Sequence, residues 1–138
     1  MNKIVDFDAI GYVAATFPVA EAAKTYLKSN HLNALTGNVD VNGKNLVVTL
    51  KADGTVGFGT GAASDKLLGV MRTYEQDGFA AVQISGGVDL VPTASALTAG
   101  RRALAVNAKG ELVEVEGGRE ATVAKPSETE NLFASIIL

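Results

Sequence analysis

The chain contains no cysteine and no tryptophan, and His31 is the one histidine among its 138 residues. The missing cysteines exclude disulfide bonds, thiol nucleophiles and thiolate metal ligands. A single histidine without cysteine is too small a ligand set for an ordinary zinc site, and it argues against a nucleophilic triad. Such a residue is more often found at a surface or at a helix end. We therefore expect no enzyme, no metal and no cofactor.

Charge is also sparse, with 12 basic and 15 acidic residues and a net charge of -3. A phosphate-binding surface usually needs a basic stripe, and none is visible, so nucleic acid is not an expected partner. No stretch approaches the ~20 apolar residues of a membrane span. The opening MNKIVDFDAIGYVAATF does not read as a signal peptide, because Asp6 and Asp8 interrupt its apolar run. We expect the chain to stay in the cytoplasm where it is made, or to assemble there.

Glycine, in contrast, is abundant, with 15 residues, and many of them occupy turn sequences. Asn-Gly and Asp-Gly pairs between alternating runs are strong signals of β-hairpins. These signals occur at Asn42-Gly43, Asp53-Gly54 and Asp77-Gly78, with a looser turn at Asn107–Gly110. Two-residue turns would set Val39 opposite Leu46, Leu50 opposite Gly57, and Met71 opposite Ile84. The pattern predicts a mainly β protein.

The segment AVQISGGVDL (81–90) alternates apolar and polar residues straight through Gly86-Gly87. A two-residue hairpin there would set Ile84 opposite Asp89, a pairing that cross-strand contacts disfavour. We therefore expect a kink within one long strand whose apolar residues, through Leu90, share one face. Such kinks let a sheet turn a corner and close. The expected fold is a small curled antiparallel β-barrel or sandwich.

Further elements follow from the rest of the pattern. Pro92 is expected to end the long strand, two strands flank the turn at Asn107–Gly110, and a short strand precedes Pro126. The apolar end NLFASIIL (131–138) predicts a last, buried strand. No internal repeat with a fixed period is evident.

One segment, Phe17–Asn30, departs from the β pattern and predicts a short helix. It is rich in alanine and lysine, and Pro18 suits the first helical position. We divide the chain into an N-terminal arm and helix (1–35) and a single β domain (36–138). The arm sequence is too apolar for a free tail, so we expect it to dock on a neighbouring subunit or on a partner protein. Its candidate interface residues are Phe7, Ile10, Tyr12 and Phe17, because aromatic anchors usually dominate interfaces. The alternative is that the arm packs on its own domain.

Three further patterns suggest chemistry less strongly. Gly57-x-Gly59 approaches the dinucleotide fingerprint, which requires a preceding strand and a following helix within a βαβ unit. Here a hairpin precedes the motif and a strand pattern follows it. Glu114 and Glu116 share a strand parity and could hold a cation, although such pairs are usually a solvated face. Arg101-Arg102 would project to opposite faces of a strand and make a weak clamp.

The C-terminal part, Lys66 to Leu138, resembles the head decoration proteins of tailed phages, the small capsid cement or stabilising proteins. The resemblance is carried by Leu68-Gly69-Val70, Ile84-Ser85-Gly86, Leu97-Thr98-Ala99-Gly100, Asn107–Gly110 and the closing aliphatic strand. The sequence departs from that pattern at ATVAKPSETEN (121–131), where the family often has a Gly-x-Ala strand and another glycine turn. The N-terminal third is not covered.

The resemblance implies a virion protein without catalysis that sits on the capsid exterior. It would bind the major capsid protein, often as a trimer, and stabilise the head against internal genome pressure. Two alternatives stay open. One is another phage structural β domain, such as a head-fibre base or a tail component, and the other is a β-barrel that binds a small molecule.

Overall fold

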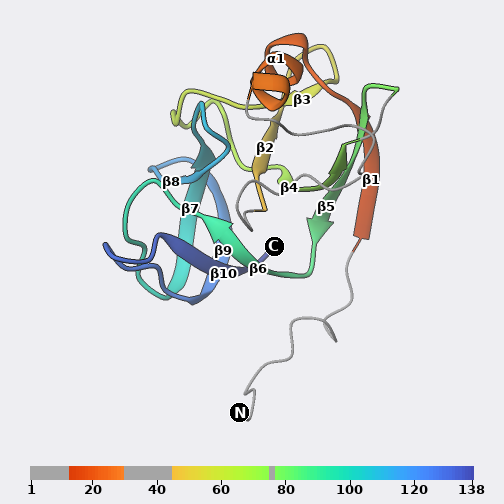
Figure 1. Cartoon of the computed structure of the whole chain (residues 1–138). Coiled ribbons are helices and arrows are strands. Elements are labelled where there is room, and N and C mark those ends of the chain that lie inside the picture. Colours follow the sequence, from red (N-terminus) through yellow and green to blue (C-terminus); the bar gives the residue numbers. More distant parts are fainter. Residues whose placement is uncertain (1–12, 30–44, 75–76) are drawn as a thin grey trace.

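The computed structural model describes residues 13–29, 45–74 and 77–138, which form two five-stranded antiparallel sheets and one helix. The first sheet consists of β1 (Val13–Pro18), β2 (Val47–Leu50), β3 (Val56–Gly57), β4 (Gly69–Tyr74) and β5 (Phe79–Ser85). The second consists of β6 (Gly87–Pro92), β7 (Gly100–Val106), β8 (Leu112–Glu114), β9 (Arg119–Lys125) and β10 (Phe133–Ile137). Helix α1 (Glu21–Ser29) lies over the first sheet near β3 (Figure 1). The expected mainly β fold with one short helix is confirmed.

Both sheets curl toward closure. Just after β1, Val19 makes a parallel bridge to Val56 of β3, at the far end of the sheet order β1-β5-β4-β2-β3. Just after β6, Thr93 makes a parallel bridge to Leu112 of β8, at the far end of β6-β10-β9-β7-β8. Each sheet is thus a small curled β unit, which agrees with the predicted barrel or sandwich.

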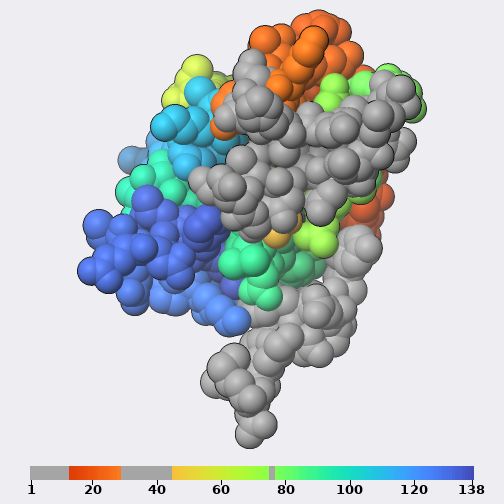
Figure 2. All heavy atoms as spheres, in the orientation of Figure 1, coloured from red at the N-terminus to blue at the C-terminus, as the bar shows by residue number. Residues whose placement is uncertain are grey.

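The two sheets have the same topology, although no fixed sequence period announced a repeat. Numbered along each half, both orders read first, fifth, fourth, second, third. The first strand of each half ends in proline, at Pro18 and Pro92. The fifth strands begin with FAAV (79–82) and FASI (133–136). Equivalent positions lie at unequal separations along the chain, so a search for a fixed period misses them. Figure 2 shows the two halves side by side.

The expected kink at Gly86-Gly87 joins the two halves. Strand β5 belongs to the first sheet and β6 to the second, and Gly86 between them has a φ of 93°. The buried amide of Gln83 donates to the carbonyl oxygens of Ser85 (3.1 Å) and Gly87 (3.0 Å), so it spans the bend. The N–H of Leu138 donates to the Gly86 carbonyl oxygen at 2.9 Å. The prediction of a bend rather than a hairpin is confirmed, but the bend separates two strands of different sheets and does not lie within one long strand.

Arg119, at the start of β9, ties the sheets together a second time. Its guanidinium donates to the carbonyl oxygens of Leu68, beside β4, and Ile84, in β5. Burial lowers the pKa of Arg119 from its ordinary value. A partly buried guanidinium with unmet donors would be costly, so these two carbonyls hold β9 against the first sheet.

The core has two apolar clusters, one under each curled sheet. The cluster of the second sheet includes Leu104 and Ile136, and it also takes in Val47 and Val70 from the first sheet. The cluster of the first sheet is covered by α1. The last strand, β10, is buried in the chain's own core, as its apolar sequence requires. Each fully buried aliphatic side chain contributes roughly 1.5–3 kcal/mol, so the shared cluster is a large part of what holds the halves together.

Helix α1 is shorter than expected, and it starts four residues later than the segment Phe17–Asn30. Pro18 is not in its first turn but ends β1, where it pairs with Phe79. Glu21 in the first turn and Lys28 in the last complement the helix dipole. Ala23 and Leu27 are buried one turn apart on the face toward the sheet.

Two predicted strand registers are wrong by small shifts. After β2, the loop closes from Lys51 to Thr55 rather than at two residues, so Leu50 faces Val56 and not Gly57. In the β4–β5 hairpin Met71 faces Val82 and not Ile84, because Tyr74 already faces Ala80 instead of Ala81 and a bulge between Met71 and Thr73 adds a second one-residue shift. Both shifts place Val56, Met71 and Val82 in the core. The predicted turn at Asn42-Gly43 lies outside the described residues.

Candidate binding groove at the β6 bulge

The most unusual backbone in the described structure is at Leu90, in the middle of β6. Ala134 of β10 faces Val91, and Ile136 faces Val88, so the register shifts within this stretch. Asp89 and Leu90 thus occupy a bulge in β6. Leu90 has a φ of 55°, and it is the one non-glycine residue with a positive φ among those described. A leucine in this left-handed region is strained.

The bulge also turns the Leu90 side chain outward, to 55% exposure. Alternation had predicted that Leu90 would share the core face of Val82 and Val88, and this expectation is wrong. Both of those valines are buried. The extra residue of the bulge breaks the period of two and sends the next side chain to solvent.

Polar contacts fix the bulge on both sides. On the β10 side, the Ser135 hydroxyl donates to the Asp89 carboxylate, and Lys125 Nζ lies 3.9 Å from the same carboxylate oxygen. On the outer side, the side-chain amide of Asn45 donates to the Asp89 carbonyl oxygen at 2.6 Å, and its N–H donates to the Leu90 carbonyl oxygen at 3.1 Å. These contacts offset the strain of the bulge. Strain held in this way is a pointer to function.

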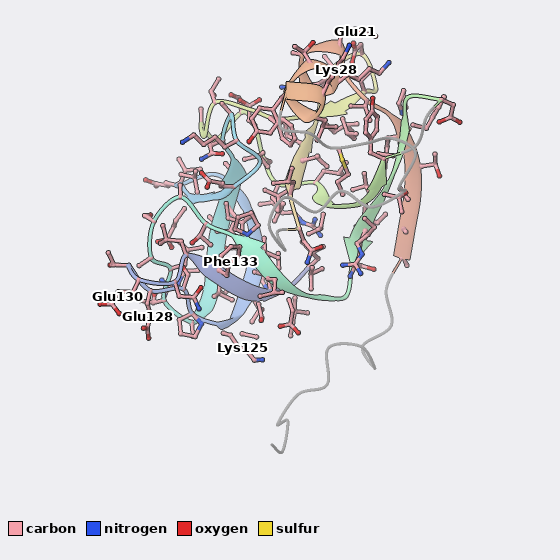
Figure 3. All side chains as sticks on the ribbon, in the orientation of Figure 1. Glu21, Lys28, Lys125, Glu128, Glu130 and Phe133 are labelled. Atoms are coloured by element: carbon pink, nitrogen blue, oxygen red, sulfur yellow. The ribbon has the colours of Figure 1, made fainter. Side chains whose placement is uncertain are left out.

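Leu90 borders a groove of about 390 Å³ between β6, β10 and the end of β9. It is lined by Asp89, Leu90, Lys125, Pro126, Asn131, Phe133, Ala134 and Ser135. Figure 3 labels Lys125 and Phe133 here, with Glu128 and Glu130 on the neighbouring loop and Glu21 and Lys28 far away on α1. Apolar and polar groups converge, as in sites that hold an apolar side chain and fix its neighbours by hydrogen bonds. The Ser135 hydroxyl is buried against a carboxylate, an arrangement suited to holding the groove's shape.

The predicted interface residues are divided between described and undescribed parts of the chain. Phe7, Ile10 and Tyr12 lie outside the described residues, as does His31. Phe17 lies in β1, half-buried, and packs against the core cluster of the first sheet. The described part of the expected arm, Val13–Pro18, is a strand that pairs with β5.

Gly57-x-Gly59 lies in β3 and the loop after it. That loop leads into β4 rather than into a helix, so the described fold lacks the βαβ unit that the dinucleotide fingerprint needs here. Gly59 is required for packing, because a Cβ there would lie 2.5 Å from the Cβ of Asp65. The hydroxyl and N–H of Thr60 donate to the Asp65 carboxylate, at 2.8 and 2.7 Å, and these bonds lower the pKa of Asp65.

The structure also gives different partners or positions to the two members of each predicted charge pair, Glu114–Glu116 and Arg101–Arg102. Strand β8 ends at Glu114, whose carboxylate lies 3.7 Å from the Arg102 guanidinium, while Glu116 is outside the strand. Arg101 pairs instead with Glu120 at 2.9 Å. Within the described residues, no group of three or more histidine, cysteine or acidic side chains could hold a metal ion.

Comparison of the chain with protein-family models, with curated proteins and with solved structures finds no match. No helix in the described part of the chain is long and apolar enough to cross a membrane. The groove and the fold therefore carry the functional argument together with the sequence resemblance.

Proposed function

We propose that the chain is a structural virion protein that decorates the outer surface of a tailed-phage head and binds the major capsid protein. The observation that carries this proposal is Leu90, a large apolar side chain held outside the fold by a strained bulge. The sequence resemblance supplies the expected partner, and the groove beside Leu90 supplies a surface for it. The proposed role is stabilisation of the capsid against genome pressure, without catalysis and on the capsid exterior.

The groove suits a protein partner better than a buried small ligand. Leu90, Pro126 and Phe133 give it apolar surface, and Lys125 and Asn131 add polar groups beside them. Interfaces usually combine an apolar anchor with a polar rim in this way. Several copies in a symmetric oligomer would multiply modest contacts by effective concentration, and a trimer suits the three-fold positions of a head.

The test is to mix purified protein with expanded, undecorated heads of the phage that encodes it and to sediment the heads. Saturable binding in hundreds of copies, at an integer number per capsid hexamer, is the expected result. A few copies per particle would instead indicate a fibre base or a tail component. Absence of binding to heads would overturn the decoration role.

Two matched variants locate the binding surface. Leu90→Asn introduces a residue that tolerates the left-handed conformation, so the melting temperature of this variant should equal or exceed that of the natural chain. Its affinity for heads should fall at least tenfold, since central apolar anchors often contribute about 2 kcal/mol or more. Leu50→Asn is the control, because Leu50 is 49% exposed but lies in β2 of the other sheet. Equal loss of affinity in both variants would contradict the role of the groove.

The small-molecule alternative rests on the groove volume, which lies within the range of about 300–1,000 Å³ typical of ligand sites. It predicts that a compound bound near Phe133 raises the melting temperature. A fragment screen read by thermal shift, with Leu90→Asn as the comparison, separates this alternative from protein binding.

A further inference from the structure

Each of the two sheets has two edge strands, and three of these four edges are protected. Edge strands expose unpaired N–H and C=O groups that can pair with another chain, so proteins shorten, charge, kink or cover them. Strand β3 has two residues and β8 has three, one of them Glu114. Strand β6 is kinked by the bulge at Leu90, carries Asp89, and receives Asn45 on its outer side.

Strand β1 has none of these protections along most of its length. Its six residues, VAATFP, include no charged side chain, and its one proline is the last residue. It pairs with β5 on one side, and no strand of the described residues pairs with its outer edge. Val13 is 56% exposed, and Ala14 and Thr16 are also exposed. Small side chains at these positions leave room for a strand to approach.

The internal repeat shows what such an edge can receive. Strand β6 is the counterpart of β1 in the second half, because each is the first strand of its sheet. The outer side of β6 is contacted at the bulge by Asn45, which comes from the other half of the molecule. The equivalent side of β1 lacks such a contact within the described structure. In the counterpart, therefore, the backbone N–H and side-chain amide of another segment bind carbonyl groups on the outer side of the edge strand.

We propose that the outer edge of β1 binds the N-terminal segment (residues 4–12) of a second copy of this chain. This segment, IVDFDAIGY, alternates apolar and acidic residues from Val5 to Ala9, the period of a strand with one buried face. It continues directly from Val13, at one end of the receiving edge. Twelve residues extend up to about 40 Å, enough to reach a neighbouring copy. In this pairing the segment buries its apolar side chains, and the outer edge of β1 gains backbone hydrogen-bond partners.

Parity disfavours a two-residue hairpin of the chain's own segment as the occupant of this edge. A two-residue hairpin at Gly11-Tyr12 would set Asp8 opposite Ala15, which is on the half-buried face of β1. The same hairpin would set Phe7 opposite Thr16, on the exposed face. The apolar residues of the segment would then face solvent, and its acidic residues would face the core side. Sheet pairing disfavours this arrangement. A segment from another copy is free to adopt the register that puts Phe7 toward the core side.

The inference concerns assembly of the chain with itself and does not depend on a capsid as partner. The test is the molar mass of the full chain by light scattering after size-exclusion chromatography. We expect a discrete oligomer for the natural chain and for Ala81→Lys. We expect at least a tenfold weaker association for Thr16→Lys, because a lysine on an edge strand blocks pairing. Thr16 and Ala81 face each other across β1 and β5, so the control places the same charge one strand inward.

A cross-link identifies the occupant. The chain has no cysteine, so a variant carrying Asp8→Cys and Thr16→Cys, which share the exposed face in the proposed register, can be joined by a short bis-maleimide without background. Joined chains on a denaturing gel support the inference, and a link within one chain overturns it. A monomeric natural chain at tens of micromolar, or an oligomer that survives Thr16→Lys, also overturns it. Failure to bind heads with the oligomer intact would instead count against the decoration role alone.

Discussion

Replacement of Gln83 by methionine tests how the two halves are joined. Gln83 is 2% exposed, and its amide makes two hydrogen bonds across the bend at Gly86, to the carbonyl oxygens of Ser85 and Gly87. Methionine has a similar length and fills the same space without donating. Each neutral hydrogen bond contributes about 1 kcal/mol, and carbonyls left unpaired in a buried site add about 1 kcal/mol more.

The apolar methionine returns up to about 1 kcal/mol through burial. The expected net loss is therefore about 2 kcal/mol in the free energy of unfolding. For a chain of this length that corresponds to a fall of roughly 8 °C in melting temperature. Because a whole domain is stable by about 5–15 kcal/mol, a loss of this size is readily measured.

The assay is urea unfolding followed by far-UV circular dichroism, since the chain has no tryptophan. Ser85→Ala is the control on the same strand. It removes a hydroxyl that accepts from the exposed N–H of Val13 and leaves the bend untouched. It should cost no more than about 0.5 kcal/mol. If Gln83→Met changes the unfolding free energy by less than about 0.5 kcal/mol, the bend does not depend on this amide and the reasoning is wrong.

Two further predictions concern the bend and a loop. Gly86→Ala should destabilise the chain by about 1–2 kcal/mol because the φ of 93° is unfavourable for alanine. Gly87 has no positive φ, so Gly87→Ala should cost less. Equal losses in the free energy of unfolding, measured in urea, would contradict the role of Gly86 as the bending residue. Asp65 has a lowered pKa in the folded chain because the hydroxyl and N–H of Thr60 donate to its carboxylate. Its stabilising effect is present above the unfolded pKa of about 3.9 and disappears as the pH falls through the lower folded value. Asp65→Asn should therefore be less stable than the natural chain at pH 7, with a gap that narrows below about pH 4, and a gap independent of pH would argue against this.

Much of the fold could be predicted from the sequence because local chemistry and tertiary structure agree. The alternation through Gly86-Gly87 argued against a hairpin, because a two-residue turn there would pair apolar with polar residues. That mismatch was enough to infer the bend. The helix and the last strand followed from composition and period. The predicted registers are wrong where loop length or a bulge decides them, since the extra residue between Met71 and Thr73 shifts the pairs of Met71 and Val70.

The candidate groove was not predictable in the same way. The alternation that correctly placed Val82 and Val88 also assigned Leu90 to the core. A bulge depends on contacts with Ser135, Lys125 and Asn45, which are distant in sequence. The alternation of residues within one strand carries no information about these distant contacts. The error nevertheless falls at a strained position, where local rules are expected to fail when a site is built.

The repeat also separates what folding requires from what the molecule adds. Both halves close by the same device, a parallel bridge just after the first strand, so Val19–Val56 and Thr93–Leu112 belong to the shared architecture. The bulge in β6 and the open edge of β1 are not shared. Their strain and exposure bring the domain itself no stability, and curled sheets of this topology form in each half without the other's feature. The two proposals, a capsid partner at the groove and a second copy at the edge, assign each feature its own partner, and they predict that Leu90→Asn and Thr16→Lys weaken two different associations while leaving the fold intact.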